Sequence, residues 1–95
     1  MADTHKRTVD SREIAQAFAQ RHHNTLSAID LVLRQCPAAA VHFQFRLHTV
    51  PAGLGGTRHV RRALISREGF MLLSMSFPSK QRELALQWLV SRFNQ

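Results

Sequence analysis

The chain has 95 residues and a formal net charge of +7, because its 13 lysines and arginines outnumber its six aspartates and glutamates. This length suits one modest domain, covering residues 1–95, and leaves little room for a deep catalytic cleft. Such a charge favours a polyanionic partner, either nucleic acid or acidic lipid, although a basic protein can also carry its charge merely for solubility.

Cysteine usage and hydropathy narrow the cellular setting. The single cysteine, Cys36, excludes an intrachain disulfide and is typical of a reducing cytosol. No apolar run approaches the roughly 20 residues that a membrane-spanning helix needs. Residues 1–7 also lack the apolar stretch of a secretory signal. We therefore expect a cytoplasmic protein without membrane contact.

The first predicted element is a helix that begins near Asp10 and ends near Gln20. Asp10 and Glu13 have the spacing of a capping box, in which each side chain accepts from a free backbone N–H at the helix start. Residues 1–8 before it are polar, and we expect them to be flexible, although their basic side chains leave a DNA-binding arm open.

A second helix is predicted from Asn24, as N-cap, to Gln35, after a polar connector at residues 21–24. Pro37 ends it. Its apolar residues recur at helical spacing: Leu26, Ile29 and Leu33. Two short amphipathic helices with a polar connector are typical of a helix-turn-helix, although many helical hairpins share this spacing.

Residues 42–48 alternate between polar and apolar side chains, which predicts a strand with Phe43, Phe45 and Leu47 facing the core. Residues 51–56 read as a glycine-rich turn, and residues 57–66 as the returning strand. A hairpin after a helix-turn-helix is the layout of a winged helix. Its arginines suit phosphate contacts, although charges also keep a solvated edge strand from aggregating.

Two further helices are predicted, over residues 67–75 and from Ser79 onward, separated by Phe77-Pro78. The last helix carries an apolar stripe that either closes the core or forms a symmetric dimer: Leu84, Leu86, Trp88, Leu89, Val90 and Phe93. The fold class is therefore α+β and winged helix-turn-helix-like. We expect a core that contains Ile14, Phe18, Leu26, Ile29, Phe43, Phe45, Phe70, Trp88 and Phe93.

Catalytic and metal-binding patterns are missing from the sequence. His22 and His23 are adjacent and point about 100° apart on a helix. His42 and His48 lie roughly 20 Å apart on a strand. No CxxC, HExxH or phosphate-binding glycine motif occurs, and the acidic residues are scattered. We expect no metal, no cofactor and no enzymatic activity.

Several segments carry a resemblance by their order and spacing. RHHNTL (residues 21–26) follows an opening helix at residues 9–18, and ISREGFMLL covers residues 65–73. Residues 75–80 and 88–94 form a third segment at the C-terminal end of the pattern. Together these resemble the phage regulatory protein Rha family, whose corresponding elements read RHDNVL and LTRDGFTLL. The resemblance implies phage or prophage gene regulation in the cytoplasm of a bacterial host.

The chain departs from the family pattern at His23, Ser27, Ala63 and Pro78-Ser79. These departures affect the surface of the second helix, so a bound DNA sequence cannot be carried over from the family.

The sequence thus predicts a transcriptional regulator that binds double-stranded DNA, with a homodimer as an option. The second helix would enter the major groove and the hairpin would hold phosphates. The expected DNA-binding residues are Arg21, His22, His23, Asn24, Thr25, Ser27, Ala28, Arg46, Arg58, Arg61 and Arg62. The main alternative is an antirepressor that binds an acidic protein surface. A nucleic-acid enzyme and a membrane-surface helix are weaker alternatives.

Overall fold

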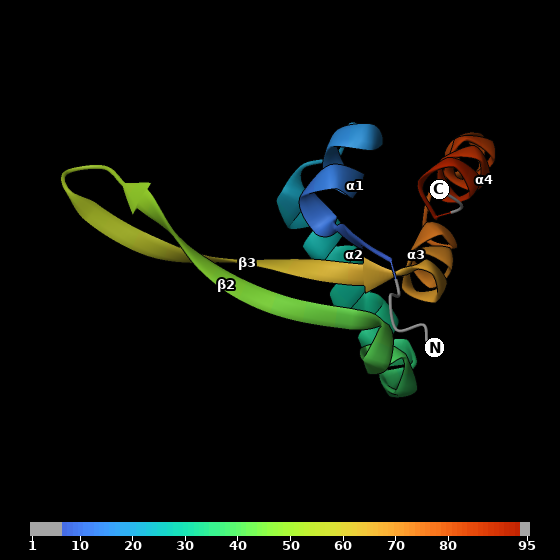
Figure 1. Cartoon of the computed structure of the whole chain (residues 1–95), viewed down its shortest axis with the longest axis horizontal. Coiled ribbons are helices and arrows are strands. Elements are labelled where there is room, and N and C mark those ends of the chain that lie inside the picture. The colour runs from blue at the N-terminus through green and yellow to red at the C-terminus, as the bar shows by residue number, and fades with distance from the viewer. Residues whose placement is uncertain (1–6, 94–95) are drawn as a thin grey trace.

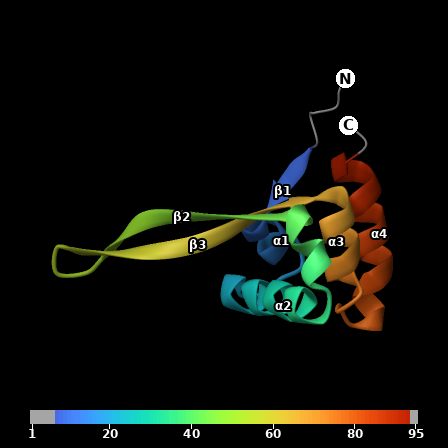
Figure 2. The ribbon, with the colours of Figure 1, turned by 90° about the horizontal axis from the view of Figure 1, so that it is seen from below.

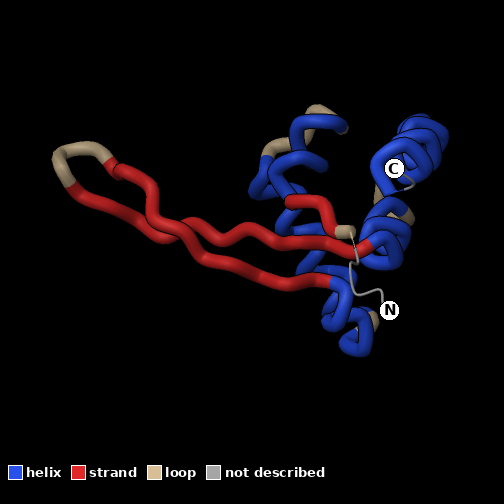
Figure 3. Tube along the Cα trace, in the orientation of Figure 1, coloured by secondary structure: helices blue, strands red, loops and turns tan. Residues whose placement is uncertain are grey.

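The computed structural model describes residues 7–93. Figures 1 and 3 show helices gathered around the root of a long hairpin. The elements, in chain order, are β1 (Thr8–Asp10), α1 (Ser11–Ala17), α2 (His22–Gln35), the 3-10 helix η1 (Pro37–His42), β2 (Phe43–Ala52), β3 (Gly56–Ser66), α3 (Arg67–Ser74) and α4 (Ser79–Phe93). The predicted α+β class, with two helices, a hairpin and two further helices, is confirmed.

The sheet has the order β1-β3-β2, and both pairings are antiparallel. β2 and β3 pair from Phe43↔Ile65 out to Ala52↔Gly56, whereas β1 covers only the root of β3, from Ser66 to Leu64. Beyond this root the hairpin continues as a two-stranded ribbon, which extends away from the helices in Figure 1. We call residues 46–62 of this ribbon the arm.

The N-terminal region differs from the prediction in two ways. Thr8 lies in β1, so the expected flexible segment of residues 1–8 is wrong at Thr8, while residues 1–6 lie outside the described residues. The capping box of Asp10 and Glu13 is confirmed. However, α1 ends at Ala17 rather than near Gln20, because Ala19 has a φ of 52° and this left-handed conformation cannot continue a helix.

The start of α2 is also displaced from the prediction. The backbone N–H groups of Asn24 and Thr25 donate to the carbonyl of Arg21, so Arg21 is the N-cap and the helix begins at His22. The expected capping role of Asn24 is therefore wrong. The chain has already reversed at Ala19, which lets the helix begin earlier than the polar residues suggested.

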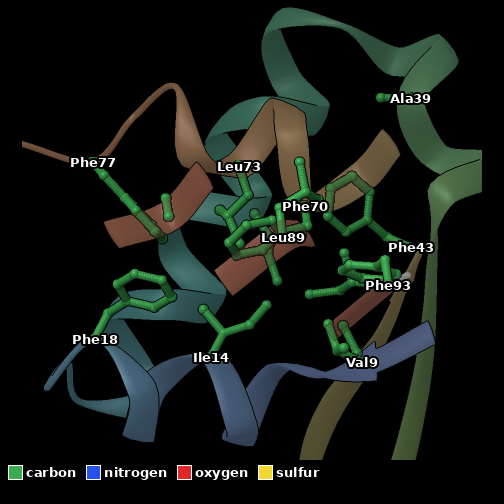
Figure 4. Close-up of a cluster of buried hydrophobic side chains, with 14 residues drawn as sticks. Val9, Ile14, Phe18, Ala39, Phe43, Phe70, Leu73, Phe77, Leu89 and Phe93 are labelled. Atoms are coloured by element: carbon green, nitrogen blue, oxygen red, sulfur yellow. The ribbon is translucent and has the colours of Figure 1, made fainter. Parts of the chain in front are cut away.

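The core lies where α1, α2, α3 and α4 meet the root of the sheet (Figure 4). Its centre is aromatic: the ring of Phe18 lies 4.9 Å from that of Phe77 and 5.7 Å from that of Trp88, between centroids. Leu26, Phe45 and Trp88 pack against it while partly exposed. The other predicted core residues are buried: Ile14, Phe18, Ile29, Phe43, Phe70 and Phe93.

Four apolar residues of the predicted strand and stripe are exposed: Leu47, Leu84, Leu86 and Val90. Leu47 is 71% exposed, because the hairpin has left the core by that position. Leu86 and Val90 on α4 are 62% and 58% exposed. Ala85, with Leu89 and Phe93, supplies the buried face of α4, so the stripe that contacts the core is narrower than predicted.

The join between β3 and α3 is close-packed. Ser66 caps α3 by accepting from the backbone N–H of Gly69, and its hydroxyl lies 2.9 Å from Nδ1 of His42. A Cβ atom on Gly69 would lie 2.8 Å from the carbonyl oxygen of His42, so only glycine fits without a shift. His42 itself ends η1, and the strand begins one position later than expected.

Candidate nucleic-acid interface

The first half of α2 presents a polar face. Arg21, His23, Asn24 and Ser27 are exposed, and Ala28 is half-buried beside them. Ser27 follows Asn24 by three positions and His23 by four, so both side chains neighbour Ser27 on the helix surface. Within residues 7–93 the side chain of Asn24 has no hydrogen-bond partner, and its amide is free to contact a ligand.

Thr25 differs from the expectation. It is fully buried, and its hydroxyl donates to Oε1 of Gln20 at 2.7 Å, across the turn between α1 and α2. This hydrogen bond satisfies a buried polar group and braces the turn. Thr25 therefore lies behind the exposed face of α2 and does not contribute its hydroxyl to that face.

His22 is half-buried and ties the start of α2 to the rest of the fold. Its Nε2 lies 2.8 Å from the hydroxyl of Ser11, and the same hydroxyl accepts from the backbone N–H of Ala63 in β3. The chain thus links α1, α2 and β3 through one buried oxygen. This arrangement gives His22 a positioning role in the fold.

The surroundings of His22 favour its neutral form. Burial is the largest cause that lowers the pKa of His22. The carboxylate of Asp10 raises this pKa, whereas Arg12, His48 and Arg61 lower it further.

Two of the predicted arm arginines are held by acidic residues. Arg61 donates to both carboxylate oxygens of Asp30 on α2, at 2.6 and 3.2 Å, and its guanidinium lies 5.0 Å from the ring centroid of Phe45. Arg62 donates to Asp10 at 2.7 Å. These contacts join the base of the arm to α2 and to the cap of α1.

Asp10 serves two roles at once. It caps α1, and it accepts from the guanidinium groups of Arg12 and Arg62. Burial opposes ionisation of its carboxyl, but the hydrogen bonds from Arg12 and Arg62 outweigh burial and lower the pKa of Asp10. The single carboxylate is shared by Arg12 and Arg62, so the three side chains together keep one net positive charge.

The remaining arm arginines are exposed. Arg46 donates to the side chain of Gln44 and to the carbonyl of Phe45, both on its own strand. Arg58 has no hydrogen bond or ion pair to any residue from 7 to 93. The register places Arg46 opposite Arg62, and Arg58 opposite Val50, on one face of the ribbon. Arg46 and Arg58 are thus the free cations of the arm.

Sequence reasoning missed the anchoring role of Asp30. A signal was present, because Asp30 is the one acidic residue between Glu13 and Glu68 and so the natural partner for a cation of the hairpin. It also missed Arg34, an exposed cation in the last turn of α2.

α2 and the arm carry the exposed cations and polar side chains of this region. By strand alternation, Arg46 and Arg58 lie on the ribbon face of Arg62, opposite the face from which Arg61 reaches α2. Figure 2 shows the arm extending beyond α2, with the helix lying alongside the base of the ribbon. Since Arg61 neutralises Asp30, no unpaired carboxylate lies between residues 14 and 66. We call this set of side chains the α2–arm face; it consists of Arg21, His23, Asn24, Ser27, Arg46 and Arg58.

Its chemistry is that of charge and hydrogen bonding. Long guanidinium side chains on a ribbon suit phosphate oxygens, and an exposed amide on a helix suits the edge of a base. Over residues 7–93, no group of three His, Cys, Asp or Glu side chains is placed to hold a metal ion. In the same residues, no helix combines the length and apolar character needed to cross a bilayer.

Comparison with known proteins identifies the family. No curated protein and no solved structure matches the chain. The family model of the phage regulatory protein Rha matches residues 9–95, a range that begins in β1 and includes the α2–arm face together with α3 and α4. The chain therefore belongs to the phage regulatory protein Rha family.

Proposed function

We propose that this phage regulatory protein is a transcriptional regulator that binds double-stranded DNA through the α2–arm face. The observation that carries the proposal is that Arg46 and Arg58 are exposed and form no ion pair within residues 7–93, while the one acid of α2, Asp30, is paired with Arg61. The order of helix, turn, helix and hairpin is also that of a winged helix-turn-helix.

In this proposal α2 reads bases. Its first half, which carries His23, Asn24 and Ser27, enters the major groove, whose width accepts a helix. Asn24 does not cap the helix, so its amide is available, and an asparagine amide can pair with the N6 and N7 atoms of adenine. Arg21 precedes the helix and reaches a phosphate at the groove edge.

In this proposal the arm contacts the phosphate backbone of the DNA. Arg46 and Arg58 contact phosphates on either side of the groove, because phosphate contacts need charge and reach rather than a shaped site. Arg61 and Arg62 support them indirectly, since they fix the base of the ribbon to α2 and α1. In this proposal, two of the four hairpin arginines expected from the sequence contact phosphates, and the other two hold the arm in place.

The test is binding to duplex DNA, measured by fluorescence anisotropy over a salt series with random and phage-regulatory sequences. The three free arginines of the face, Arg21, Arg46 and Arg58, suggest about three phosphate contacts, so the log–log slope of affinity against salt should be roughly −2.5 to −3. A preference for one sequence would identify an operator. No binding near about 50 mM salt would contradict the proposal.

A protein-binding antirepressor is the second candidate. Leu47 and Leu54 are 71% and 110% exposed along the arm, and exposed apolar side chains are typical of protein contacts. This candidate predicts an acidic protein partner for the arm and no affinity for unrelated duplex DNA at low salt.

A further inference from the structure

A second exposed surface lies between α3 and α4, at the end of the molecule away from the tip of the arm (Figure 2). It is an apolar groove of about 460 Å³. Met71 and Met75 line it from α3, and Leu86 lines it from α4. Their side chains are 43%, 71% and 62% exposed. Neither the core nor the α2–arm face accounts for these residues.

Helical spacing explains why the groove forms. On α3, Phe70 and Leu73 face the core, so Met71 and Met75, four residues apart, form a separate stripe. On α4, Ala85 and Leu89 are buried, which leaves Leu86 on the next face. Each helix thus has an apolar stripe toward the core and a second one toward solvent. Exposed apolar stripes on adjacent helices mark an interaction surface.

The two ends of the groove carry opposite charges. Glu68 lines it at the start of α3, whereas Arg82 lines its continuation beside Ser74, Met75 and Leu86. The two helices run antiparallel, because the start of α3 lies near the end of α4: the rings of Phe70 and Phe93 are 6.3 Å apart between centroids. Glu68 and Arg82 therefore occupy opposite ends.

We propose that this groove binds the same groove of a second copy of the chain, through a two-fold axis near Met71 and Leu86. A two-fold operation reverses the groove end for end, so Glu68 of each copy meets Arg82 of the other. The apolar side chains pair at the centre and the two ion pairs lie at the rim, which is the usual anatomy of a protein interface.

Self-complementarity is what selects a second copy as the occupant. A groove with one acidic and one basic end matches itself in the antiparallel orientation without any further partner. Arg67 and Glu83, the sequence neighbours of the two charges, do not line the groove. Methionine side chains adapt their shape readily, which favours close packing across the axis. The dimer does not depend on DNA, and its test is separate from that of the proposed function.

The first test is sedimentation velocity on the full chain over a dilution series, with Leu86→Glu and Leu84→Glu. Leu84 is a matched control, because it is 45% exposed on the same helix and does not line the groove. We expect a native dimer that Leu86→Glu weakens at least about tenfold and Leu84→Glu leaves unchanged. Circular dichroism and thermal melting check that each variant folds.

The second test is a charge exchange across the axis. Glu68→Arg and Arg82→Glu should each weaken the dimer by placing like charges together, and the double variant should recover native affinity. A native chain that stays monomeric up to about 1 mM would overturn the proposal. So would a dimer that Leu86→Glu does not affect, or single variants whose effects merely add in the double variant.

Discussion

Ser11 and His22 make the most constrained polar contact of the fold. The hydroxyl of Ser11 is fully buried and accepts from the backbone N–H of Ala63, and it lies 2.8 Å from Nε2 of His22. Burial and the nearby guanidinium groups of Arg12 and Arg61 disfavour the charged ring at this position, so the folded chain holds His22 in its neutral form and the pKa of His22 is lowered.

Stability should consequently fall in mild acid. Because burial lowers the pKa of His22 below its ordinary value, the unfolded chain takes up the proton first as the pH falls below about 6.5. The full contribution is present above that pH and is lost below it. We expect the melting temperature to fall between about pH 7.5 and 5.5, measured by circular dichroism.

His22→Gln should flatten this pH dependence, because glutamine does not titrate. The matched control is His23→Gln, since His23 is the next residue and is exposed. A slope that His22→Gln leaves as steep as in the native chain would contradict the assignment.

Single residues show where sequence reasoning works and where it fails. The capping box of Asp10 was predictable, because it needs only residues three positions apart. Asn24 was misassigned as a cap, and Thr25 as exposed, because the turn before them reverses at Ala19. An alanine in the left-handed conformation gives no signal in the sequence.

Among the elements, the arm depends on how it is tied down. The ion pair of Arg61 and Asp30 is about half exposed, so its contribution to stability is about 1 kcal/mol or less. Its main effect is on orientation, because a bidentate contact fixes the angle of the ribbon relative to α2. Arg46 and Arg58 then project from a ribbon of set orientation.

Replacement of both free arm arginines should weaken DNA binding without unfolding the chain. We expect Arg46→Ala/Arg58→Ala to reduce affinity for all duplexes alike and to flatten the salt slope by about one to two units. The measurement is anisotropy over the same salt series. The melting temperature should stay near the native value, because neither side chain has an ion pair among residues 7–93.

The control is Arg67→Ala/Lys80→Ala, which removes the same charge from exposed positions of α3 and α4. Equal losses of affinity in both double variants would show that net charge, rather than the arm, drives binding.

Whole elements were predictable where a periodic pattern extends over many residues. The hairpin, α3 and α4 follow from alternation and from helical spacing. β1 and η1 were not predicted, because a short strand such as Thr8–Asp10 is defined by its pairing with β3 and has too few residues for a pattern. The exposure of Leu47 likewise follows from the length of the arm, which alternation alone does not reveal.

At the scale of the molecule, two surfaces face different directions. The α2–arm face is made of residues of α2 and the arm, while the groove lies between α3 and α4, the helices at the end remote from the arm's tip (Figure 2). A net charge of +7 predicted a cationic surface but not which arginines are free. Which arginines are free depends on Asp10 and Asp30, because these two acids pair with Arg62 and Arg61, which are distant from them in the sequence.

The most direct test of DNA binding through the α2–arm face is a titration of the isotope-labelled chain with duplex DNA, followed by amide resonances in nuclear magnetic resonance spectra. The account predicts that the shifts concentrate at residues 21–28 and along the arm, while Met71 and Leu86 stay unchanged. Shifts confined to α3 and α4, or none at about 50 mM salt, would contradict it.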